Sequence, residues 1–179
     1  MEKYSIYIIV LAVFVVRLIF LQTSKKNEKE ILANGGEEYG AANSKRMTIL
    51  HIIFYFGSLL EAVITKTKFD KISLIGVFFL IFSMIMLYIV VHLLEGIWTV
   101  KLMIAKNHQF NNHWLFEKVK HPNYFLNIVP ELIGLGLICH SFITCIIVFP
   151  FYAVVMYIRI KEENMLIERI IKPNTNRYN

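Results

Sequence analysis

The sequence has little cysteine, and the two cysteines that it has lie within apolar stretches. Cys139 and Cys145 are too few for a disulfide framework or, on their own, for a metal site. No group of His, Cys and Asp residues has zinc or di-iron spacing, which argues against a metal centre. The chain also lacks a GxGxxG turn and a βαβ pattern, so a soluble Rossmann-type fold is excluded. We expect both cysteines to be small buried apolar residues.

Charge is also scarce over long parts of the chain. Of the 179 residues, 56% are hydrophobic and only 18% are charged, and the mean hydropathy is +0.55. A soluble domain is roughly 45–50% apolar and lacks apolar runs of membrane length. Here the charged residues gather in short clusters between long apolar runs. This layout is typical of a polytopic membrane protein.

Five membrane spans fit the apolar runs best. The first three cover residues 4–21, 48–64 and 72–93, and the last two divide residues 124–158 at a turn near His140 and Ser141. Each half of the last run has about 17 residues, the short end for spanning. A single helix of about 35 residues would measure about 50 Å, too long for the bilayer core. We therefore expect a helical hairpin there.

The predicted fold is an all-α integral membrane protein with a single polytopic domain over residues 1–179. Residues 1–93 would supply three helices and a loop, and residues 94–179 a second loop, the hairpin and a C-terminal tail. The first apolar run lacks a basic segment before it and a small-residue cleavage site, so we expect it to be retained as a helix. Alternating Lys and Glu residues in the loop at 23–45 favour a short surface helix that stops at Gly35 and Gly36.

The net charge of +6 has an explanation in topology, and we do not expect a nucleic-acid partner. Lys and Arg are enriched in cytoplasmic loops of membrane proteins. With five spans, four basic residues fall on one side: Lys3, Lys66, Lys68 and Lys71. Fourteen fall on the other: Lys25, Lys26, Lys29, Lys45, Arg46, Lys101, Lys106, Lys118, Lys120, Arg159, Lys161, Arg169, Lys172 and Arg177. This predicts a cell-membrane protein with its N-terminus outside.

A few ionisable residues lie at membrane depth, where they are costly and usually functional or paired. Arg17 and Glu61 lie near span ends, and we expect them to snorkel toward the interface. We expect His51 to have an ordinary hydrogen-bonded role. Glu131 follows Pro130, which frees a backbone carbonyl and kinks the helix. Its carboxylate either lines a cavity or is a neutral buried acid, and both readings stay open.

Two polar clusters border the last apolar run. Arg159 and Glu163 are four residues apart, so their heads share one helix face, beside Glu162. They form either an ion pair at a helix end or a charge pair in a site, where Arg159 would hold an anionic oxygen in bidentate fashion. The segment from His121 to Tyr124 is either a stiff helix start or part of the same site.

Taken together, these segments resemble the isoprenylcysteine carboxyl methyltransferase family. The resemblance rests on Trp98-Thr99, His108, the Lys-His-Pro-Asn-Tyr sequence at 120–124, and Arg159 followed by Glu162 and Glu163, in that order. It covers residues 98–170 well, and KNEKEILANGGEEYGA is similar to bacterial members. It implies a pocket on the cytoplasmic side that binds S-adenosylmethionine.

The resemblance also implies which residues form the site. Those assigned to the cofactor are Lys101, His108, Gln109, Phe110, Asn111, Phe116, His121, Pro122, Asn123, Tyr124, Glu162 and Glu163. Arg159 is implied as the substrate-holding residue and Glu163 as a cofactor contact. Together with Glu131, which is expected from its place beside Pro130, they form the predicted catalytic set. The methyl group would pass in line from sulfonium to oxygen, a reaction that needs alignment more than acid chemistry. A weakly acidic phenol would need a base, with His121 or Glu131 nearest.

The expected function is S-adenosylmethionine-dependent O-methylation of a lipidic acceptor, a carboxylate or an acidic hydroxyl, that enters from the bilayer. Relatives in the bacterial branch methylate alkylpyrones or alkylresorcinols, and the acceptor stays open among these, prenylcysteine and other lipids. Three alternatives also remain: a phospholipid N-methyltransferase, an NADPH-dependent membrane reductase and a non-enzymatic membrane scaffold. Binding of S-adenosylhomocysteine rather than NADPH would separate them.

Overall fold

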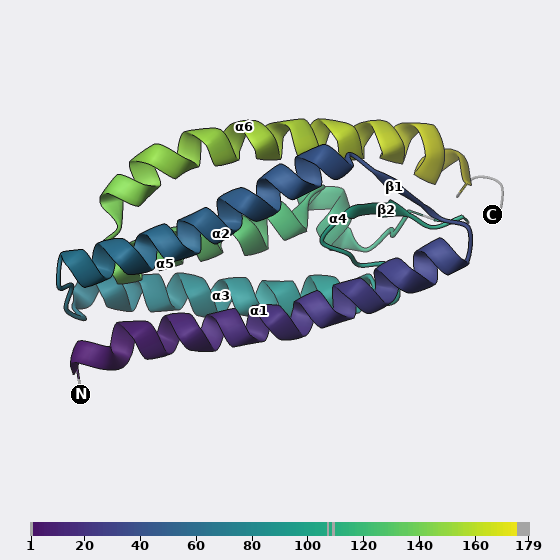
Figure 1. Cartoon of the computed structure of the whole chain (residues 1–179). Coiled ribbons are helices and arrows are strands. Elements are labelled where there is room, and N and C mark those ends of the chain that lie inside the picture. The colour runs from purple at the N-terminus through teal and green to yellow at the C-terminus, as the bar shows by residue number, and fades with distance from the viewer. Residues whose placement is uncertain (1, 107, 109, 175–179) are drawn as a thin grey trace.

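The computed structural model describes residues 2–106, 108 and 110–174. Long helices run side by side in a bundle, and two short strands with a short helix lie at one end of it (Figure 1). In chain order the elements are α1 (Glu2–Ala33), β1 (Glu37–Tyr39), α2 (Ala41–Ile64), α3 (Lys71–Leu93), β2 (Leu102–Ile104), α4 (Trp114–Val119), η1 (Asn123–Ile128), α5 (Val129–Cys139), α6 (Phe142–Leu166) and η2 (Ile167–Ile171).

The predicted all-α membrane fold is confirmed. Among the described residues, α1, α2, α3 and α6 are long and apolar enough to cross a membrane. The fifth crossing is shorter and consists of η1 and α5, which form one apolar helix over Asn123–Cys139. The predicted turn follows it directly, with His140 in the left-handed region at φ 50°. The last two helices therefore form the expected hairpin.

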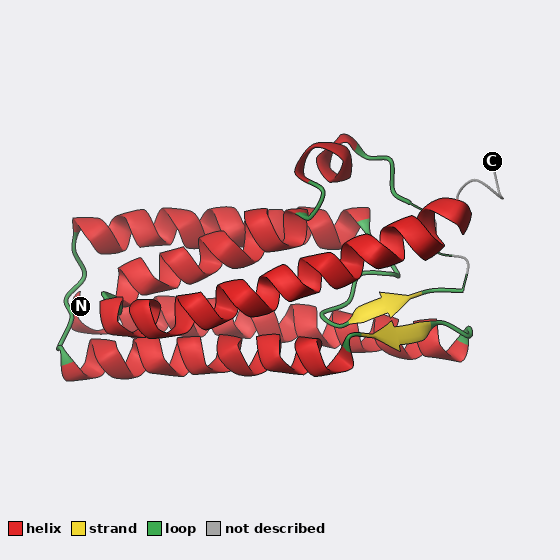
Figure 2. Cartoon of the chain, turned by 90° about the horizontal axis from the view of Figure 1, so that it is seen from above, coloured by secondary structure: helices red, strands yellow, loops and turns green. Residues whose placement is uncertain are grey.

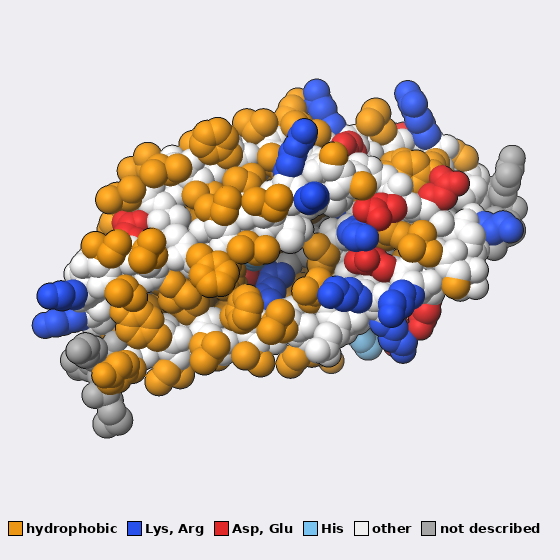
Figure 3. All heavy atoms as spheres, in the orientation of Figure 1, with side chains coloured by type: hydrophobic (Ala, Val, Ile, Leu, Met, Phe, Trp, Pro, Cys, Tyr) orange, Lys and Arg blue, Asp and Glu red, His pale blue; other side chains and the backbone are white. Residues whose placement is uncertain are grey.

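The outer faces of the helices suit a lipid environment. Large hydrophobic side chains such as Phe56, Leu60, Phe78 and Ile146 are more than 60% exposed. Figure 3 shows hydrophobic side chains over most of the face in view, with most of its charged side chains toward the end that holds the strands. So much exposed apolar surface would be unstable in water, whereas lipid covers it without cost.

Two helices are longer than their hydropathy predicts. The expected surface helix after the first span is instead the end of α1, which runs unbroken to Ala33. Gly36 N donates to Ile31 O and Gly35 N to Leu32 O, with Gly35 at φ 79°. These are the two bonds of a Schellman motif, and the predicted stop at the glycine pair is correct. The second helix begins at Ala41 rather than at residue 48, because polar residues in its first turns are buried.

The strands form a two-stranded antiparallel ribbon that joins distant parts of the sequence. Glu37 pairs with Ile104, Glu38 with Met103 and Tyr39 with Leu102. In Figure 2 the ribbon lies at the end of the bundle, beside the far end of α1. The ribbon thus ties the loop after α1 to the loop after α3.

Close contact between α3 and α5 depends on two glycines. A Cβ on Gly76 would lie 2.7 Å from the carbonyl oxygen of Gly134, and one on Gly134 would lie 2.8 Å from that of Gly76. Small residues let helix backbones approach in this way in membranes. This contact fixes the position of α5, and therefore of η1, along the axis of α3.

We predict that Gly134→Ala lowers the thermal unfolding midpoint in detergent, because the new methyl group forces α3 and α5 apart. Overpacking of this kind costs on the order of 1–3 kcal/mol. Gly57→Ala is the matched control, since it carries the same gain in helix propensity but meets only the Thr144 side chain, at 3.0 Å. Equal midpoints for the two variants would contradict the close contact.

Candidate active site

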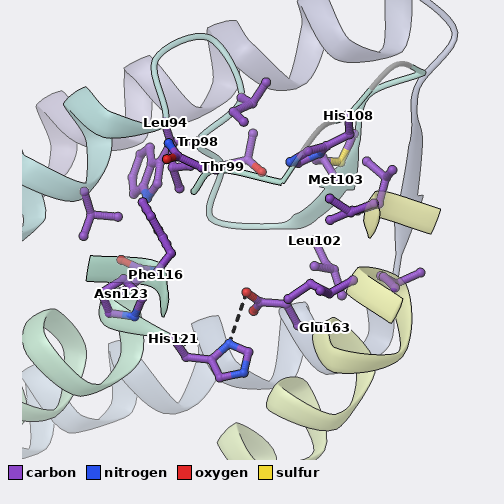
Figure 4. Close-up of a pocket in the computed structure, with 18 of the residues that line it drawn as sticks. Leu94, Trp98, Thr99, Leu102, Met103, His108, Phe116, His121, Asn123 and Glu163 are labelled. Atoms are coloured by element: carbon purple, nitrogen blue, oxygen red, sulfur yellow. Dashed lines mark ion pairs between the residues drawn. The ribbon is translucent and has the colours of Figure 1, made fainter. Parts of the chain in front are cut away.

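A pocket opens between the ends of α3, η1 and α6 and is covered by the loop after α3. Its cavity volume is about 150 Å³, and the pocket is open at its mouth. Figure 4 shows Trp98, Phe116 and Asn123 facing His108 and Leu102 across this space. The walls are largely apolar, and their polar groups come from the loops before α4 and before η1 as well as from η1 and α6.

Arg159 lines the pocket and is almost fully buried, with 3% of its surface exposed. Its Nε donates to the hydroxyl of Tyr124 at 3.2 Å, and one terminal nitrogen donates to Val100 O at 3.2 Å. The other terminal nitrogen donates to the hydroxyl of Ser44. All three partners are neutral, and Arg159 makes no ion pair within the described part of the chain. The guanidinium therefore keeps its charge available to a ligand.

Glu163 lies one helical turn after Arg159 and also lines the pocket. Its Oε2 accepts from the Tyr124 hydroxyl at 2.7 Å. Its Oε1 lies 3.2 Å from His121 Nδ1, the ion pair drawn in Figure 4. Tyr124 thus bridges the two charged residues, which face one cavity as the helical spacing predicts.

The pKa values of the two pocket histidines shift in opposite directions. Burial disfavours the charged form of His121, but its interactions with Glu163 and Asn164 outweigh burial, and its pKa is raised. Burial lowers the pKa of His108, and the charge of Glu163 opposes this only in part. The partners of His121 therefore shift it toward the imidazolium, and burial shifts His108 toward the neutral ring.

Several buried nitrogen atoms of the pocket lack a hydrogen-bond partner within the described residues. They include Nδ1 of His108 and the indole Nε1 of Trp98. Buried polar atoms are normally paired, so unpaired ones in a pocket wall are suited to bind a ligand. Lys120, at the same wall, has φ 58°, a costly conformation that recurs at functional sites.

The loop that covers the pocket is fixed to α1 and to the ribbon. Asn27 Nδ2 donates to Trp98 O at 2.8 Å, and Val100 N donates to Ser24 Oγ at 2.9 Å. Lys101 lies 3.3 Å from Glu28 and 3.1 Å from Glu38. Its hydrogen bond to Glu38 raises its pKa, burial opposes the rise, and the charge of Glu28 adds to it. The loop is therefore held in place without a ligand.

The structure brings most of the predicted site residues together. Most of the site residues predicted from the sequence line the pocket: Lys101, His108, Phe110, Asn111, Phe116, His121, Pro122, Asn123, Tyr124, Arg159 and Glu163. Glu162 does not line it, and its carboxylate instead packs against Gly40. Gln109 lies outside the described residues.

Glu131 lies in a second polar cluster, deeper in the bundle, and does not line the pocket. It is fully buried and forms an ion pair with Arg17. The expectation that Arg17 snorkels to the interface is therefore wrong, because an inward carboxylate offers it a stronger partner than the lipid headgroups. Glu61 does not snorkel freely either, since it accepts from the backbone nitrogens of Ile143 and Thr144 at the start of α6.

Sequence patterns do not reveal several of the residues that line the pocket or bind Arg159. Ser44 carries no signal, because a lone serine before an apolar run has no recognisable spacing. The strand at Leu102–Ile104, which lines the pocket, is too short for a period-two pattern to be detected. Trp98 is singled out only through the family resemblance, and the sequence does not reveal its unpaired indole nitrogen.

Comparisons with known proteins find relatives that are similar over most of the chain. An uncharacterised protein of Haemophilus influenzae is 42% identical over 151 residues, which cover 84% of this chain and 88% of that protein. The uncharacterised protein YpbQ of Bacillus subtilis is 22% identical over 163 residues, which cover 90% of this chain and 96% of YpbQ. No solved structure gives a significant match.

The pocket-forming half of the chain carries the family relationship. Residues 74–169 match the model of the isoprenylcysteine carboxyl methyltransferase family, which is more than half of the chain. The matched region runs from α3 through the covering loop, η1 and α5 to η2, and it contains both Arg159 and Glu163. The expected family is confirmed: the chain belongs to the isoprenylcysteine carboxyl methyltransferase (ICMT) family of membrane methyltransferases.

Proposed function

We propose that the protein is an S-adenosylmethionine-dependent O-methyltransferase whose acceptor is a lipid with an acidic oxygen. One observation carries the proposal. Arg159 is buried in the pocket wall and is hydrogen-bonded only to neutral groups. A buried charge without an opposite charge costs several kcal/mol, and an anionic ligand oxygen would remove that cost. The cation is therefore built to receive an anion.

The pocket fits the proposed methyl donor. The indole Nε1 of Trp98 can donate to an adenine or ribose acceptor, and His108 Nδ1 offers a second polar contact. Apolar walls at Val90, Leu102 and Phe116 suit the flat purine ring. Glu163 supplies negative charge for the cationic part of the donor. These features together favour S-adenosylmethionine over a purely apolar ligand.

Arg159, Glu163 and Tyr124 would divide the work of the reaction. When bound, S-adenosylmethionine supplies an electrophilic methyl group, which passes to the acceptor oxygen and leaves S-adenosylhomocysteine. Arg159 holds the acceptor oxygen and keeps it ionised. Glu163 orients the donor, and Tyr124 fixes both side chains through its hydroxyl. Alignment of this kind removes much of the entropic barrier to a two-reactant step.

The Arg159 guanidinium also predicts the charge of the acceptor. A carboxylate or an enol that is ionised near neutral pH needs no general base. An amine acceptor, as in phospholipid N-methylation, would be repelled by Arg159. Apolar residues that line the pocket, including Leu94, Leu166 and Ile167, suit a lipid chain that enters from the bilayer.

We also propose that the pocket faces the cytoplasm and that the N-terminus lies outside. Support comes from the excess of basic residues in the segments at the pocket end, as positively charged loops remain inside. The methyl donor is a soluble cytoplasmic metabolite, so this orientation also gives the pocket its supply.

We predict that the purified protein binds S-adenosylhomocysteine in detergent and that Glu163→Gln weakens this binding about ten- to a hundredfold. The reason is the loss of one charge-assisted contact. Isothermal titration calorimetry measures both affinities. Glu168→Gln is the matched control, because Glu168 is exposed and pairs with Lys172 outside the pocket. Binding of NADPH without binding of S-adenosylhomocysteine would refute the proposal.

Arg159→Lys should lose most of the transfer activity while it still binds S-adenosylhomocysteine. Lysine keeps the charge but loses the planar fork, so the rate should fall roughly ten- to a hundredfold. The assay follows tritium from methyl-labelled S-adenosylmethionine into the fraction of a membrane lipid extract that the wild type labels. Arg169→Lys, at an exposed position on η2, is the control. Full activity of Arg159→Lys would make Arg159 a helix-end anchor only.

A cysteine at Asn112 should react with membrane-impermeant maleimide only after the cells are opened, because the loop that carries it is exposed and would be cytoplasmic. A cysteine at Lys68, in the exposed turn between α2 and α3, is the opposite control and should react in intact cells. The wild type, with its two native cysteines, gives the background. Labelling of the Asn112 variant in intact cells would reverse the proposed orientation.

A further inference from the structure

A polar cluster lies inside the helical bundle, away from the pocket, where α1, α2 and α5 meet. Arg17 Nε donates to Glu131 Oε1 at 2.7 Å, and a terminal nitrogen of Arg17 pairs with the other carboxylate oxygen. The Tyr55 hydroxyl donates to Glu131 Oε1, and His51 Nε2 lies 3.6 Å from it. Charged groups at this depth are costly unless they are paired or serve a function.

A chain of hydrogen bonds leads from this cluster to the pocket. The terminal nitrogen of Arg17 that pairs with Glu131 also donates to Asn127 Oδ1 at 2.8 Å. Asn127 is 1% exposed, and its Nδ2 donates to Asn123 Oδ1 at 2.9 Å. Asn123 lines the pocket beside Tyr124. Three side chains therefore connect a cation on α1 to the wall of the proposed donor site.

The segment that these hydrogen bonds hold, η1, is intrinsically unstable. Asn123–Ile128 is a π-helix, a rare form that survives where its surroundings support it and that often marks functional sites. Pro130 follows closely and has no backbone N–H to give, which weakens the regular helical bonding at this point. Asn127 compensates, since it also accepts from Ser83 of α3 at 3.2 Å.

The position of Arg17 in the sequence makes this arrangement informative. Arg17 lies on α1, outside residues 74–169 that match the family model. Figure 1 shows α1 along one edge of the bundle, with its far end beside the ribbon. Ser24 and Asn27 of α1 already hold the covering loop. Arg17 would give α1 a second attachment, to the part of the pocket wall that η1 supplies.

We infer that Arg17 is a positioning residue that acts through Asn127 to fix Asn123 and the π-helical wall of the donor pocket. The inference rests on the proposed function and deepens it. Glu131 holds the Arg17 fork in place and neutralises its charge, so its role is to position Arg17 and not to touch the acceptor. Tyr124, the neighbour of Asn123, carries the effect on to Arg159 and Glu163.

Two variants interrupt the hydrogen-bond path from Arg17 to Asn123 at different points. Asn127→Ala removes the link to Asn123 but leaves the Arg17–Glu131 ion pair intact. Arg17→Lys keeps a cation beside Glu131 but cannot bond both the carboxylate and Asn127 with a planar fork. Ser58→Ala is the matched control, because it removes a buried side-chain bond, to Ser141, at the end of the bundle far from the pocket.

Amide hydrogen exchange and calorimetry are the two readouts. Both test variants should speed exchange in residues 121–128 relative to Ser58→Ala, and should weaken S-adenosylhomocysteine binding about two- to tenfold, the effect of one hydrogen bond. The Arg17→Lys/Asn127→Ala double variant should bind no worse than the weaker single variant, since both cut one path. Asn127→Gln, which keeps the amide, should restore part of the affinity.

Two results would overturn the inference. One is unchanged exchange in residues 121–128, and the other is faster exchange with unchanged affinity, which would make the chain a support for the helix alone. If the wild type binds no S-adenosylhomocysteine, the proposed function fails separately. Exchange then decides the matter: faster exchange confined to residues 121–128 supports the positioning chain, and unchanged exchange refutes it.

Discussion

The buried guanidinium of Arg159 is the constraint on which the rest of the site depends. A planar cation with five N–H donors, removed from water, requires acceptors on several sides. Here they come from α2, from the loop after α3 and from η1, through Ser44, Val100 and Tyr124. Helices that would otherwise slide past one another in lipid are thereby joined at one point. That point is the pocket wall.

The bilayer explains why the remaining polar groups are organised in the same way. Lipid offers no hydrogen bonds, so a polar side chain in the bundle needs a partner within the protein. Glu131 finds one in Arg17, and Ser58 in Ser141. These contacts, together with the glycine contact between α3 and α5, set the heights of the helices. The site is therefore precise although most of the helical surface only faces lipid.

Long apolar runs and helical spacing predict much of this protein. The five helices, the turn at His140 and the common face of Arg159 and Glu163 all follow from such patterns. Pairing between distant residues does not. Nothing in the apolar run around Arg17 shows that it turns inward, because its partner Glu131 lies 114 positions away. Ser44, which meets Arg159 across 115 positions, could not be predicted for the same reason.

The resemblance to a family supplies what the spacing does not. It indicates a set of pocket residues from the sequence, and most of them line one cavity. It does not indicate the ribbon of β1 and β2, whose strands have three residues each, nor the π-helix. Both are short, irregular elements that tertiary contacts stabilise, and local sequence signals are weakest for such elements.

The most direct test of the account is an experimental structure of the protein with S-adenosylhomocysteine. We expect the ligand between Trp98 and Glu163, with its purine against the apolar wall and with the Arg159 guanidinium open to the acceptor side. Arg159 should keep its bonds to Ser44 and Val100 in that complex. A ligand bound elsewhere on the protein, or an Arg159 side chain neutralised by a protein carboxylate, would contradict the account.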